Sequence, residues 1–249
     1  MTALACHTDC ATCTGPLSTD CLTCSISTRR VVNRVCTCNT ALSTGYRRRF
    51  SGTEHELAAD PFTQFTAWLA EAAERRVYEP NAMVIGTIDP DGRPSSRTVL
   101  LRGVDERGFA FYTDYTSRKG RALIANPGIS AVFPWYPLHR QVLIYGEAHK
   151  VDEADSNDYF SNRPRGAQIA AWSSDQSHPI DGRDALEQKV RDTEAHFADA
   201  ETVPRPERWG GFRIVPDRIE FWQGRTSRLH DRLVFERRGS GWAVTRLQP

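Results

Sequence analysis

The feature that most restricts the fold is a series of short, strand-like segments with turn signals between them, which begins at residue 81. Residues 81–88 and 95–102 are rich in β-branched and aliphatic side chains, and the Asp89-Pro90-Asp91-Gly92 sequence between them is typical of a tight turn. The further strand-like segments are residues 109–113, 129–135, 141–150, 211–215, 218–223, 232–236 and 242–246. Short strands in this number, joined by short turns, predict a mainly antiparallel sheet.

Helical segments interrupt these strands. A helix is expected from Pro61 to Arg76, because Asp60 can cap it, proline is favoured at its first position, and apolar residues recur at helical spacing. The other predicted helices are residues 117–126 with Ser117 as the cap, 152–162, 165–172 and 183–200. We therefore predict a mainly β (α+β) fold, a small antiparallel barrel with flanking helices. A doubly wound sheet is not favoured, since no Gly-x-Gly-x-x-Gly turn follows a strand.

Composition excludes several classes of protein. The chain has 249 residues, is 39% hydrophobic and carries a formal net charge of +1, so it can bury a sizeable core, and its charge does not indicate binding to nucleic acid or to an acidic membrane surface. No apolar run approaches the roughly 18 residues that a membrane span needs, and the start lacks the layout of a signal peptide. These features predict a soluble, cytoplasmic protein.

The cysteines divide the chain into two parts. All seven lie in the first 38 residues, at Cys6, Cys10, Cys13, Cys21, Cys24, Cys36 and Cys38. Residues 1–49 carry a balance of +4 and the remainder a balance of −3. This change in composition predicts a boundary between Thr40 and Phe50, with a cysteine-rich basic leader over residues 1–49 and a folded domain over residues 50–249.

Three interpretations of the leader stay open. It has few large apolar side chains, so it can be disordered or weakly structured. The two Cys-x2-Cys pairs, Cys10 with Cys13 and Cys21 with Cys24, could bind one Zn²⁺, although the spacing between the pairs is short for such a site. The repeated Cys-x-Thr-Cys pattern also resembles extracellular disulfide modules, which would need an oxidising compartment.

Basic residues in the domain mark candidate anion sites. Arg97 and Arg102 stand at the two ends of an apolar strand, and their odd spacing predicts opposite faces, hence two anionic partners, unless the strand bends. Arg118 and Lys119 fall at the start of a helix, where backbone N–H groups and the helix dipole favour a phosphate. Near the end, Arg228, His230 and Arg232 would share one face of a strand and suit a phosphorylated ring.

Neutral and aromatic residues complete the candidate site. Tyr159 and Arg163 lie beside a helix break and suit the rim of a pocket, while Gln176 and Ser177 suit the polar edge of a heteroaromatic ring. Trp222, just before the Arg-x-His-x-Arg segment, is the tryptophan we expect to have a functional role. The sequence analysis predicts that Trp135, Trp172 and Trp209 belong to the core, and no residues of the domain have the spacing of metal ligands.

From about residue 60 to residue 249 the chain resembles the pyridoxine/pyridoxamine 5′-phosphate oxidases, a family of flavoenzymes that form pyridoxal 5′-phosphate. The motifs that carry the resemblance occur in the family's order: Arg97-Thr98-Val99-Leu100-Leu101, Phe111-Tyr112-Thr113, Ser117-Arg118-Lys119, Arg140-Gln141-Val142, Tyr159-Phe160 with Arg163-Pro164-Arg165, Gln176-Ser177, Trp209-Gly210-Gly211, Glu220-Phe221-Trp222-Gln223-Gly224 and Arg228-Leu229-His230-Asp231-Arg232. The leader matches nothing in the family.

The resemblance implies a split β-barrel homodimer with FMN at the subunit interface. It also implies oxidation of pyridoxine or pyridoxamine 5′-phosphate by hydride transfer to FMN, with O₂ as the acceptor and H₂O₂ as a product. It assigns FMN to Arg97, Thr98, Val99, Leu100, Leu101, Arg102, Tyr112, Thr113, Arg118, Lys119, Gln141, Gln176, Ser177, Trp222 and Arg232. It assigns the substrate to Arg102, Tyr159, Arg163, Arg228 and His230, with Arg228 and His230 as the catalytic residues.

Two positions depart from the family pattern, which usually has lysine where this chain has Arg102 and often serine where it has Ala167. Arg102 keeps the charge but changes the geometry of its donors, and Ala167 lacks one hydroxyl group. The alternative function is a split-barrel flavin- or haem-binding protein without oxidase activity, which would not need Arg163, Arg228 and His230 together.

Overall fold

The computed structural model describes residues 12–13, 21–23, 29–32, 35–38 and 57–249. In the first part of the chain, β1 (Thr12–Cys13) pairs with β2 (Cys21–Thr23), and β3 (Arg29–Val32) pairs with β4 (Val35–Cys38), both antiparallel. The zinc, disulfide and disorder interpretations of the leader, and its boundary, depend on residues outside the described part. They therefore stay predictions.

The main body is one curled antiparallel sheet. Its strands are β5 (Ala82–Ile88), β6 (Pro94–Leu100), β7 (Gly103–Asp105), β8 (Gly108–Asp114), β9 (Gly128–Trp135), β10 (Arg140–Lys150), β11 (Trp209–Gln223), β12 (Asp231–Arg238) and β13 (Gly241–Leu247). They follow the order β13-β12-β11-β10-β9-β5-β6, and β8 pairs with both β11 and β7. A hydrogen bond of 2.8 Å from Arg102 N–H to the Ala110 carbonyl joins the end of β6 to β8 and curls the sheet towards closure.

Strand β11 connects the two halves of the sheet. One edge pairs with β10, whereas the other pairs first with β8 and then with β12. The register shifts after Tyr145, where Gly146 lies opposite Pro216, and a Cβ atom on Gly146 would lie 2.1 Å from the Val215 carbonyl oxygen. Only glycine fits at this bend. The sequence predicted two strands over residues 211–223, but the structure has one bent strand.

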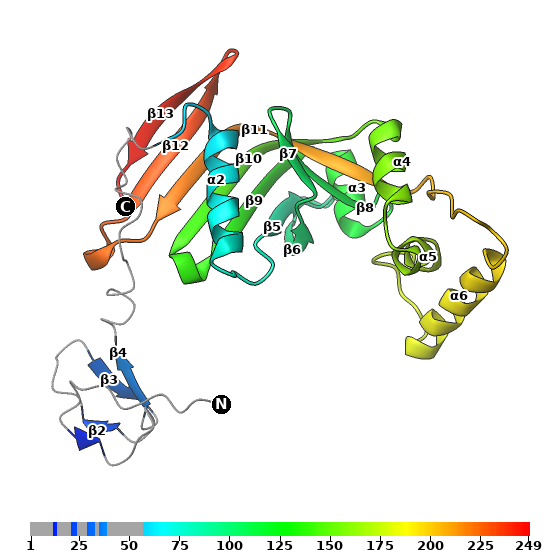
Figure 1. Cartoon of the computed structure of the whole chain (residues 1–249), viewed down its shortest axis with the longest axis horizontal. Helices are drawn as coiled ribbons and strands as arrows, with labels where there is room; N and C mark the ends of the chain where they lie inside the picture. The colour runs from blue at the N-terminus through cyan, green and yellow to red at the C-terminus, as the bar shows by residue number, and fades with distance from the viewer. Residues whose placement is uncertain (1–11, 14–20, 24–28, 33–34, 39–56) are drawn as a thin grey trace.

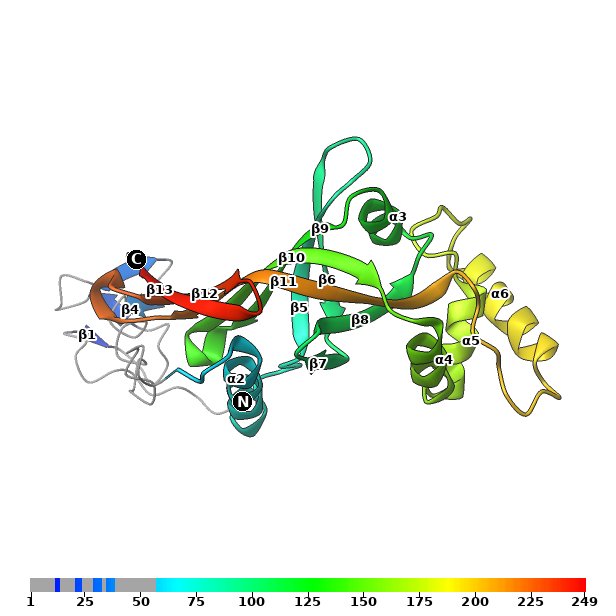
Figure 2. The same ribbon diagram turned by 90° about the horizontal axis from the view of Figure 1, so that it is seen from above.

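Five helices flank the sheet in the described part of the chain: α2 (Pro61–Glu74), α3 (Arg118–Ala125), α4 (Glu153–Ser161), α5 (Arg165–Ser173) and α6 (Arg183–His196). Short 3₁₀ turns, η3 (Tyr136–Leu138) and η4 (Thr226–Arg228), join neighbouring strands. Figures 1 and 2 show α4, α5 and α6 at one end of β11 and the β12–β13 hairpin at the other. This arrangement confirms the predicted mainly β (α+β) fold with flanking helices.

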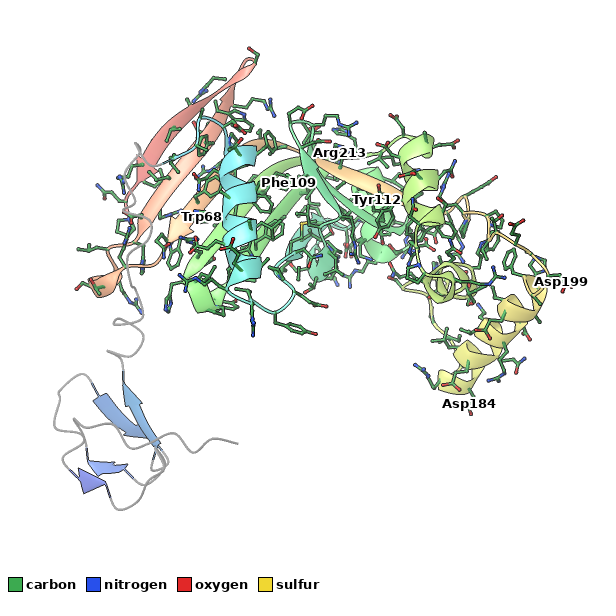
Figure 3. All side chains as sticks on the ribbon, in the orientation of Figure 1. Trp68, Phe109, Tyr112, Asp184, Asp199 and Arg213 are labelled. Atoms are coloured by element: carbon green, nitrogen blue, oxygen red, sulfur yellow. The ribbon has the colours of Figure 1, made fainter. Side chains whose placement is uncertain are left out.

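The core lies between α2 and the concave face of the sheet. Phe65 of α2 makes edge contacts with Phe109 and Phe133 at ring-centroid distances of 4.9 and 4.8 Å, and Trp68 meets Phe221 at 5.2 Å. Figure 3 shows Trp68 on this helix, Phe109 beside it, and Tyr112 further along the sheet, towards α4. The Asp60 carboxylate accepts two backbone N–H groups at the start of α2, as its capping role predicted. None of the helices in the described part of the chain is both long and apolar enough to cross a membrane.

Candidate functional site

A cavity of about 870 Å³ opens between β6, β8, the start of α3 and the segment that joins α4 to α5. The predicted site residues in its wall are Arg97, Thr98, Val99, Leu100, Arg102, Tyr112, Thr113, Lys119, Tyr159, Arg163 and Gln176. Asn162, Pro164, Ala167 and Trp209 complete the wall. We call this set the cavity group. Segments far apart in the sequence therefore meet at one concave surface.

The electrostatics of the cavity favour an anionic ligand. Four residues of the wall are cations, Arg97, Arg102, Lys119 and Arg163, and no residue of the wall is a carboxylate. Burial lowers the pKa of Lys119, Arg97 lowers it further, and the nearby carboxylate of Asp114 opposes both. Burial also lowers the pKa of Arg163. Cations that burial destabilises in this way gain from a bound anion such as a phosphate.

Strand β6 supplies the first two cations. The Arg97 guanidinium donates to the Thr87 hydroxyl at 2.8 Å and to the Ser95 hydroxyl at 2.7 Å, so two neutral groups fix its direction. Residues Arg97 and Arg102 both line the same cavity. Opposite faces were expected only for a strand that does not bend, and the exception applies here, because β6 ends at Leu100, before Arg102. Leu101 is buried in the core at 5% exposure, outside the cavity wall.

The start of α3 supplies Lys119 but turns Arg118 away. The Ser117 hydroxyl accepts the Gly120 N–H at 3.2 Å, which confirms the predicted cap. Lys119 Nζ donates to Gln176 Oε1 at 2.6 Å and to Thr113 Oγ1 at 3.2 Å. Arg118 instead forms an ion pair of 2.5 Å with buried Asp89, and the hydrogen bond from Arg118 lowers the pKa of that carboxyl group. Arg118 is absent from the cavity wall.

Residues 174–177, which follow α5, form what we call the strap. Gln176 in the strap reaches the cavity, where its Oε1 accepts from both Lys119 and the Thr113 hydroxyl, the latter at 3.1 Å. Ser177 has a φ of 69°, in the left-handed region, and lies outside the wall. Such backbone strain in a residue without a glycine's freedom requires the surrounding structure to hold the strap in place.

An aromatic stack forms the far wall of the cavity. Tyr112 lies 3.9 Å from Tyr159 and 5.6 Å from Trp209 between ring centroids, with interplanar angles of 9° and 14°. The Arg163 guanidinium lies 4.5 Å from the Trp209 centroid, and its Nη1 atom is buried without a hydrogen-bond partner in the described part of the chain. A buried donor without a partner is costly, so Arg163 is prepared for an acceptor in the cavity.

Trp209 is a site residue that the sequence analysis assigned to the core. It is 7% exposed and also lines the cavity, so both descriptions apply. Gly211, two residues further along β11, was the available signal: a Cβ atom there would lie 2.8 Å from Tyr112 Cε1, so glycine allows the stack to form. Trp135 is buried as predicted, but Trp172 is 38% exposed and packs only partly, against Phe197.

The remaining predicted residues form a second group, which we call the C-terminal group: Gln141, Trp222, Arg228, His230 and Arg232. Gln141, Trp222 and Arg232 lie in register across β10, β11 and β12. Glu220, at 2% exposure, binds the Arg232 guanidinium through both carboxylate oxygens, at 2.5 and 3.0 Å. This hydrogen bonding raises the pKa of Arg232 and holds its side chain over the sheet.

Arg228 and His230 do not lie in a strand. Strand β12 begins at Asp231, Arg228 ends η4, and His230 belongs to the loop between them. The prediction that Arg228, His230 and Arg232 share one strand face is therefore wrong. Ser227 and Arg228 have φ values of 56° and 61°, which a strand does not allow, and no residue pattern around them predicts this conformation.

The geometry of the loop defines the hydrogen bonding of His230. Its Nδ1 atom accepts the backbone N–H of Arg225 at 3.0 Å, and its ring lies 4.6 Å from that of Trp222. Burial lowers the pKa of His230, and the neighbouring Arg228 lowers it further. The ring is therefore neutral near pH 7, with its proton on Nε2, so that Nε2–H is a hydrogen-bond donor.

The two groups lie apart within one chain. No residue between Trp222 and Arg232 contributes to the cavity wall. The cavity group gathers near β8 and the helices α3 to α5, whereas the C-terminal group lies at the opposite end of β11 (Figures 1 and 2). A site that uses both groups therefore needs a second copy of the chain.

Comparisons with known proteins agree with this division. A sequence model described as pyridoxamine 5′-phosphate oxidase matches residues 69–197. A second, described as the pyridoxine 5′-phosphate oxidase C-terminal dimerisation region, matches residues 209–249. The first contains the cavity group apart from Trp209, and the second contains all of the C-terminal group except Gln141.

Individual relatives cover most of the chain. Pyridoxine/pyridoxamine 5′-phosphate oxidase from Rubrobacter xylanophilus is 50% identical over 82% of this chain and 95% of its own length. The protein of the same name from Streptomyces avermitilis is 51% identical over 79% of this chain and 90% of its own. The crystal structure of PhzG from Burkholderia lata, in complex with tetrahydrophenazine-1-carboxylic acid, has a TM-score of 0.76 and 34% identity over 82% of this chain and all of that chain.

Proposed function

The chain belongs to the pyridoxamine 5′-phosphate oxidase family, and from that premise we propose how its two groups of residues share the work of the enzyme. The protein is an FMN-dependent oxidase that converts pyridoxine or pyridoxamine 5′-phosphate to pyridoxal 5′-phosphate. Oxygen is reduced to H₂O₂, and with the amine substrate water enters and ammonia leaves. The observation that carries the assignment of residues is the cavity wall with four cations and no carboxylate.

The residues of the cavity group fit a bound FMN. Lys119 and Arg97 lie on the β6–α3 side of the cavity, where Thr113 and Gln176 add neutral hydrogen-bonding groups. These residues suit the FMN phosphate and the polar edge of its ring system. A bound FMN would supply the acceptor for the hydride from the 4′ carbon of the substrate, with O₂ as the final electron acceptor. The protein's part is to bind, orient and charge-balance the reactants.

Arg163, Arg102 and Tyr159 suit the substrate phosphate. Arg163 presents a buried Nη1 donor that has no partner among the described residues, and Arg102 lies close enough to lower its pKa further. A phosphate oxygen would satisfy that donor and offset the charge of both guanidinium groups. Because Arg102 replaces a lysine in the family pattern, its planar fork can offer that phosphate a bidentate contact.

The C-terminal group completes the site from a second copy of the chain. Its residues lie within the segment that matches the dimerisation region, apart from Gln141 on the neighbouring strand. In a two-fold homodimer, the Arg228 and His230 of one copy would face the cavity of the other, and each dimer would hold two such sites. FMN would then lie at the interface, with Gln141, Trp222 and Arg232 contributed across it.

His230 acts in this site as a hydrogen-bond donor. Its Nδ1 atom accepts the Arg225 N–H and its Nε2 atom already carries a proton, so a second proton would have to enter at Nδ1, where the new N–H would oppose the Arg225 N–H. The Nε2–H group can instead donate to the substrate's 4′ amine or hydroxyl, or to the hydroxyl oxygen attached to its pyridine ring. Arg228 beside it supplies the positive charge that orients the substrate ring against the flavin.

Spectroscopy and turnover of the purified full-length protein test this function. We expect a flavin absorbance spectrum, release of FMN on denaturation, and H₂O₂ formation with pyridoxine or pyridoxamine 5′-phosphate. A flavin spectrum without turnover of either substrate would favour the flavin-binding alternative, and a haem spectrum would contradict the FMN assignment. Tetrahydrophenazine-1-carboxylic acid, the ligand of the PhzG relative, serves as the comparison substrate. Turnover of that compound alone would overturn the proposed substrate.

A further inference from the structure

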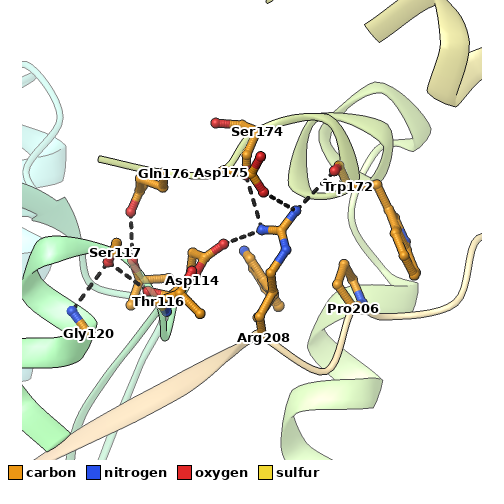
Figure 4. Close-up of polar contacts among 12 residues, drawn as sticks. Asp114, Thr116, Ser117, Gly120, Trp172, Ser174, Asp175, Gln176, Pro206 and Arg208 are labelled. Carbon is orange, nitrogen blue, oxygen red and sulfur yellow. Dashed lines mark hydrogen bonds and ion pairs between the residues drawn. The ribbon is translucent and has the colours of Figure 1, made fainter. Parts of the chain in front are cut away.

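An ion pair lies directly behind the cavity without entering it. Asp114, at the end of β8, and Arg208, just before β11, contact each other through Oδ2 and Nη1. The Asp114 side chain is 4% exposed and that of Arg208 is 23% exposed, so this is a largely buried pair. Neither residue lines the cavity, and no function has been assigned to either above. Figure 4 shows the pair with its neighbours.

Asp114 fixes the turn that leads into α3. Its Oδ1 atom accepts the Thr116 N–H at 2.7 Å and the Thr116 hydroxyl at 2.6 Å. Its backbone oxygen accepts the Ser117 hydroxyl, the same group that caps α3, at 2.6 Å. Asp114 thereby sets the position of the helix start from which Lys119 reaches the cavity. One residue earlier in β8, Thr113 lies in the cavity wall.

Arg208 fixes the start of the strap. Its guanidinium donates to the Ser174 carbonyl at 3.0 Å and to the Trp172 carbonyl at 2.9 Å, and it lies 3.7 Å from an Asp175 carboxylate oxygen. The last carbonyls of a helix have no partner within the helix, and the planar fork of arginine can satisfy two of them together with a carboxylate. Arg208 therefore links the end of α5 and the first strap residues to Asp114 (Figure 4).

Three segments of the cavity wall thus depend on one ion pair. They are the end of β8, the start of α3 and the strap, and they meet where Lys119 and Thr113 both donate to Gln176 Oε1. We propose that the Asp114–Arg208 pair is a positioning device that holds these three segments in the arrangement that FMN binding requires. The proposal rests on the assignment of FMN to this cavity.

The charge of the pair supports the same role. Asp114 places a carboxylate behind a wall whose charged residues are all cations, and it opposes the lowering of the Lys119 pKa by burial and by Arg97. Arg208 balances that carboxylate, so the pair adds little net charge. Loss of Arg208 would leave Asp114 buried beside the cavity without its partner, and would free the strap at the same time.

The affinity of the apoprotein for FMN tests this proposal. In full-length protein stripped of flavin, we expect Arg208→Gln to raise the Kd for FMN about ten- to a hundred-fold, the range expected for lost charge-assisted contacts. Arg213→Gln is the matched control, because Arg213 forms a similarly part-buried ion pair of 2.8 Å with Asp105, and neither residue lines the cavity. Arg213→Gln can lower the melting temperature but should leave the Kd for FMN within about twofold.

A double-mutant cycle separates positioning from general loss of stability. If Arg208 acts through the strap, Gln176→Ala should raise the Kd in an otherwise wild-type protein but add little to Arg208→Gln. The same substitution should multiply with Arg213→Gln, since the two sites share no contacts. Arg208→Lys should fall between wild type and Arg208→Gln, because an ammonium group can face Asp114 without spanning both carbonyl groups.

The outcomes are distinct. A wild-type Kd for FMN in Arg208→Gln, or effects of Arg208→Gln and Gln176→Ala that multiply, would overturn the positioning role. Should Arg208→Gln fail to fold, the same cycle with Arg208→Lys decides between these results. If the wild-type apoprotein does not bind FMN, the proposed function fails first, and the variants are then compared by the melting temperature alone, where equal losses for Arg208→Gln and Arg213→Gln would reject a special role of the pair.

Discussion

The two cationic regions of this protein differ in how their charges are balanced. In the cavity group, Lys119 and Arg163 form no ion pair among the described residues, and burial lowers the pKa of each. In the C-terminal group, Arg232 is bound by both oxygens of Glu220, and the neighbouring Arg225 is bound by Asp231 at 2.5 Å. The cavity wall therefore lacks carboxylates, whereas carboxylates bind Arg232 and Arg225 in the region of the C-terminal group.

This difference indicates two kinds of task. Buried cations without partners are unfavourable by themselves, so the cavity group gains stability when phosphate groups bind. Cations held by carboxylates are already fixed, so the C-terminal group can present His230 and Trp222 as a preformed surface. We infer that ligands complete the first region and that a second copy of the chain brings the second region to it.

The largest expected effect comes from removing one residue of each group. Arg163→Ala and Arg228→Ala should each lower kcat/KM about ten- to a hundred-fold, because each removes a charge-assisted contact to the substrate. If the two variants are mixed and allowed to exchange subunits, each hybrid dimer regains one intact site. About a quarter of the wild-type activity should then return, since about half of the dimers are hybrids.

The control for this experiment is a mixture of either variant with itself, which should stay at its low activity. Recovery of activity that depends on mixing would show that the cavity group of one subunit acts together with the C-terminal group of the other. A mixture that recovers nothing, although mass spectrometry shows hybrid dimers, would place both residues in the same subunit's site.

His230 gives the next largest effect. Because its Nδ1 atom is engaged by Arg225, we expect it to act through Nε2–H, a donor that a glutamine amide can replace. His230→Ala should lower kcat about tenfold or more, whereas His230→Gln should retain most of the activity. Steady-state kinetics of the two variants measure this. Equal losses in both would instead indicate that the ring transfers a proton.

The pH dependence provides a second test of the same residue. The folded-state pKa of His230 lies below its ordinary value of 6.5, so the neutral ring is complete above that value in the folded protein. Activity should therefore be constant well above pH 6.5 and fall as the pH drops through the lowered pKa of the folded state. The stability contributed by the neutral ring should fall over the window between pH 6.5 and that lowered pKa. An acid limb in wild type that is absent from His230→Gln would confirm the assignment.

Local signals allowed much of the fold to be predicted. The caps at Asp60 and Ser117 and the turn at residues 89–92 are encoded within a few residues, and all three occur as expected. Bends were not predictable in this way. The single strand β11 bends where Gly146 admits the Val215 carbonyl, a contact between residues far apart in sequence. The prediction of two separate strands there could not include that contact.

The candidate site was predicted as a set of residues but not as an arrangement. Motifs near Arg97, Lys119 and Gln176 named residues that the structure brings to one cavity wall. Ion pairs that span 29 residues, from Asp89 to Arg118, or 94 residues, from Asp114 to Arg208, leave no pattern in the sequence. The same holds for the division into two groups, since spacing along one chain does not show which residues meet across a dimer.

A smaller effect is expected from substitutions in the Glu220–Arg232 ion pair of the C-terminal group. Arg232→Ala should weaken FMN retention while leaving substrate KM nearly unchanged, and added FMN should restore part of the activity. Glu220→Gln should resemble it in milder form, because the amide can accept only one of the two hydrogen bonds. Flavin content after gel filtration measures both. If Arg228→Ala loses flavin and Arg232→Ala keeps it, the two roles are reversed.

The smallest effect should come from removing the leader altogether. Both groups of site residues lie beyond residue 96, and the family matches begin at residue 69, so nothing assigned to the site lies within residues 1–49. A variant that starts at Phe50 should fold, bind FMN with the wild-type Kd, and keep its kcat/KM within about twofold, because deletions outside a cooperative core add little to its energetics. Melting temperature, FMN titration and kinetics of the truncated and full-length proteins make the comparison. The full-length protein carrying Cys10→Ser and Cys21→Ser separates the cysteines from the rest of the leader. A truncated protein that precipitates or loses FMN would place the leader within the folded unit. The leader would then be a third region, besides the two cationic regions, that folding or FMN binding requires.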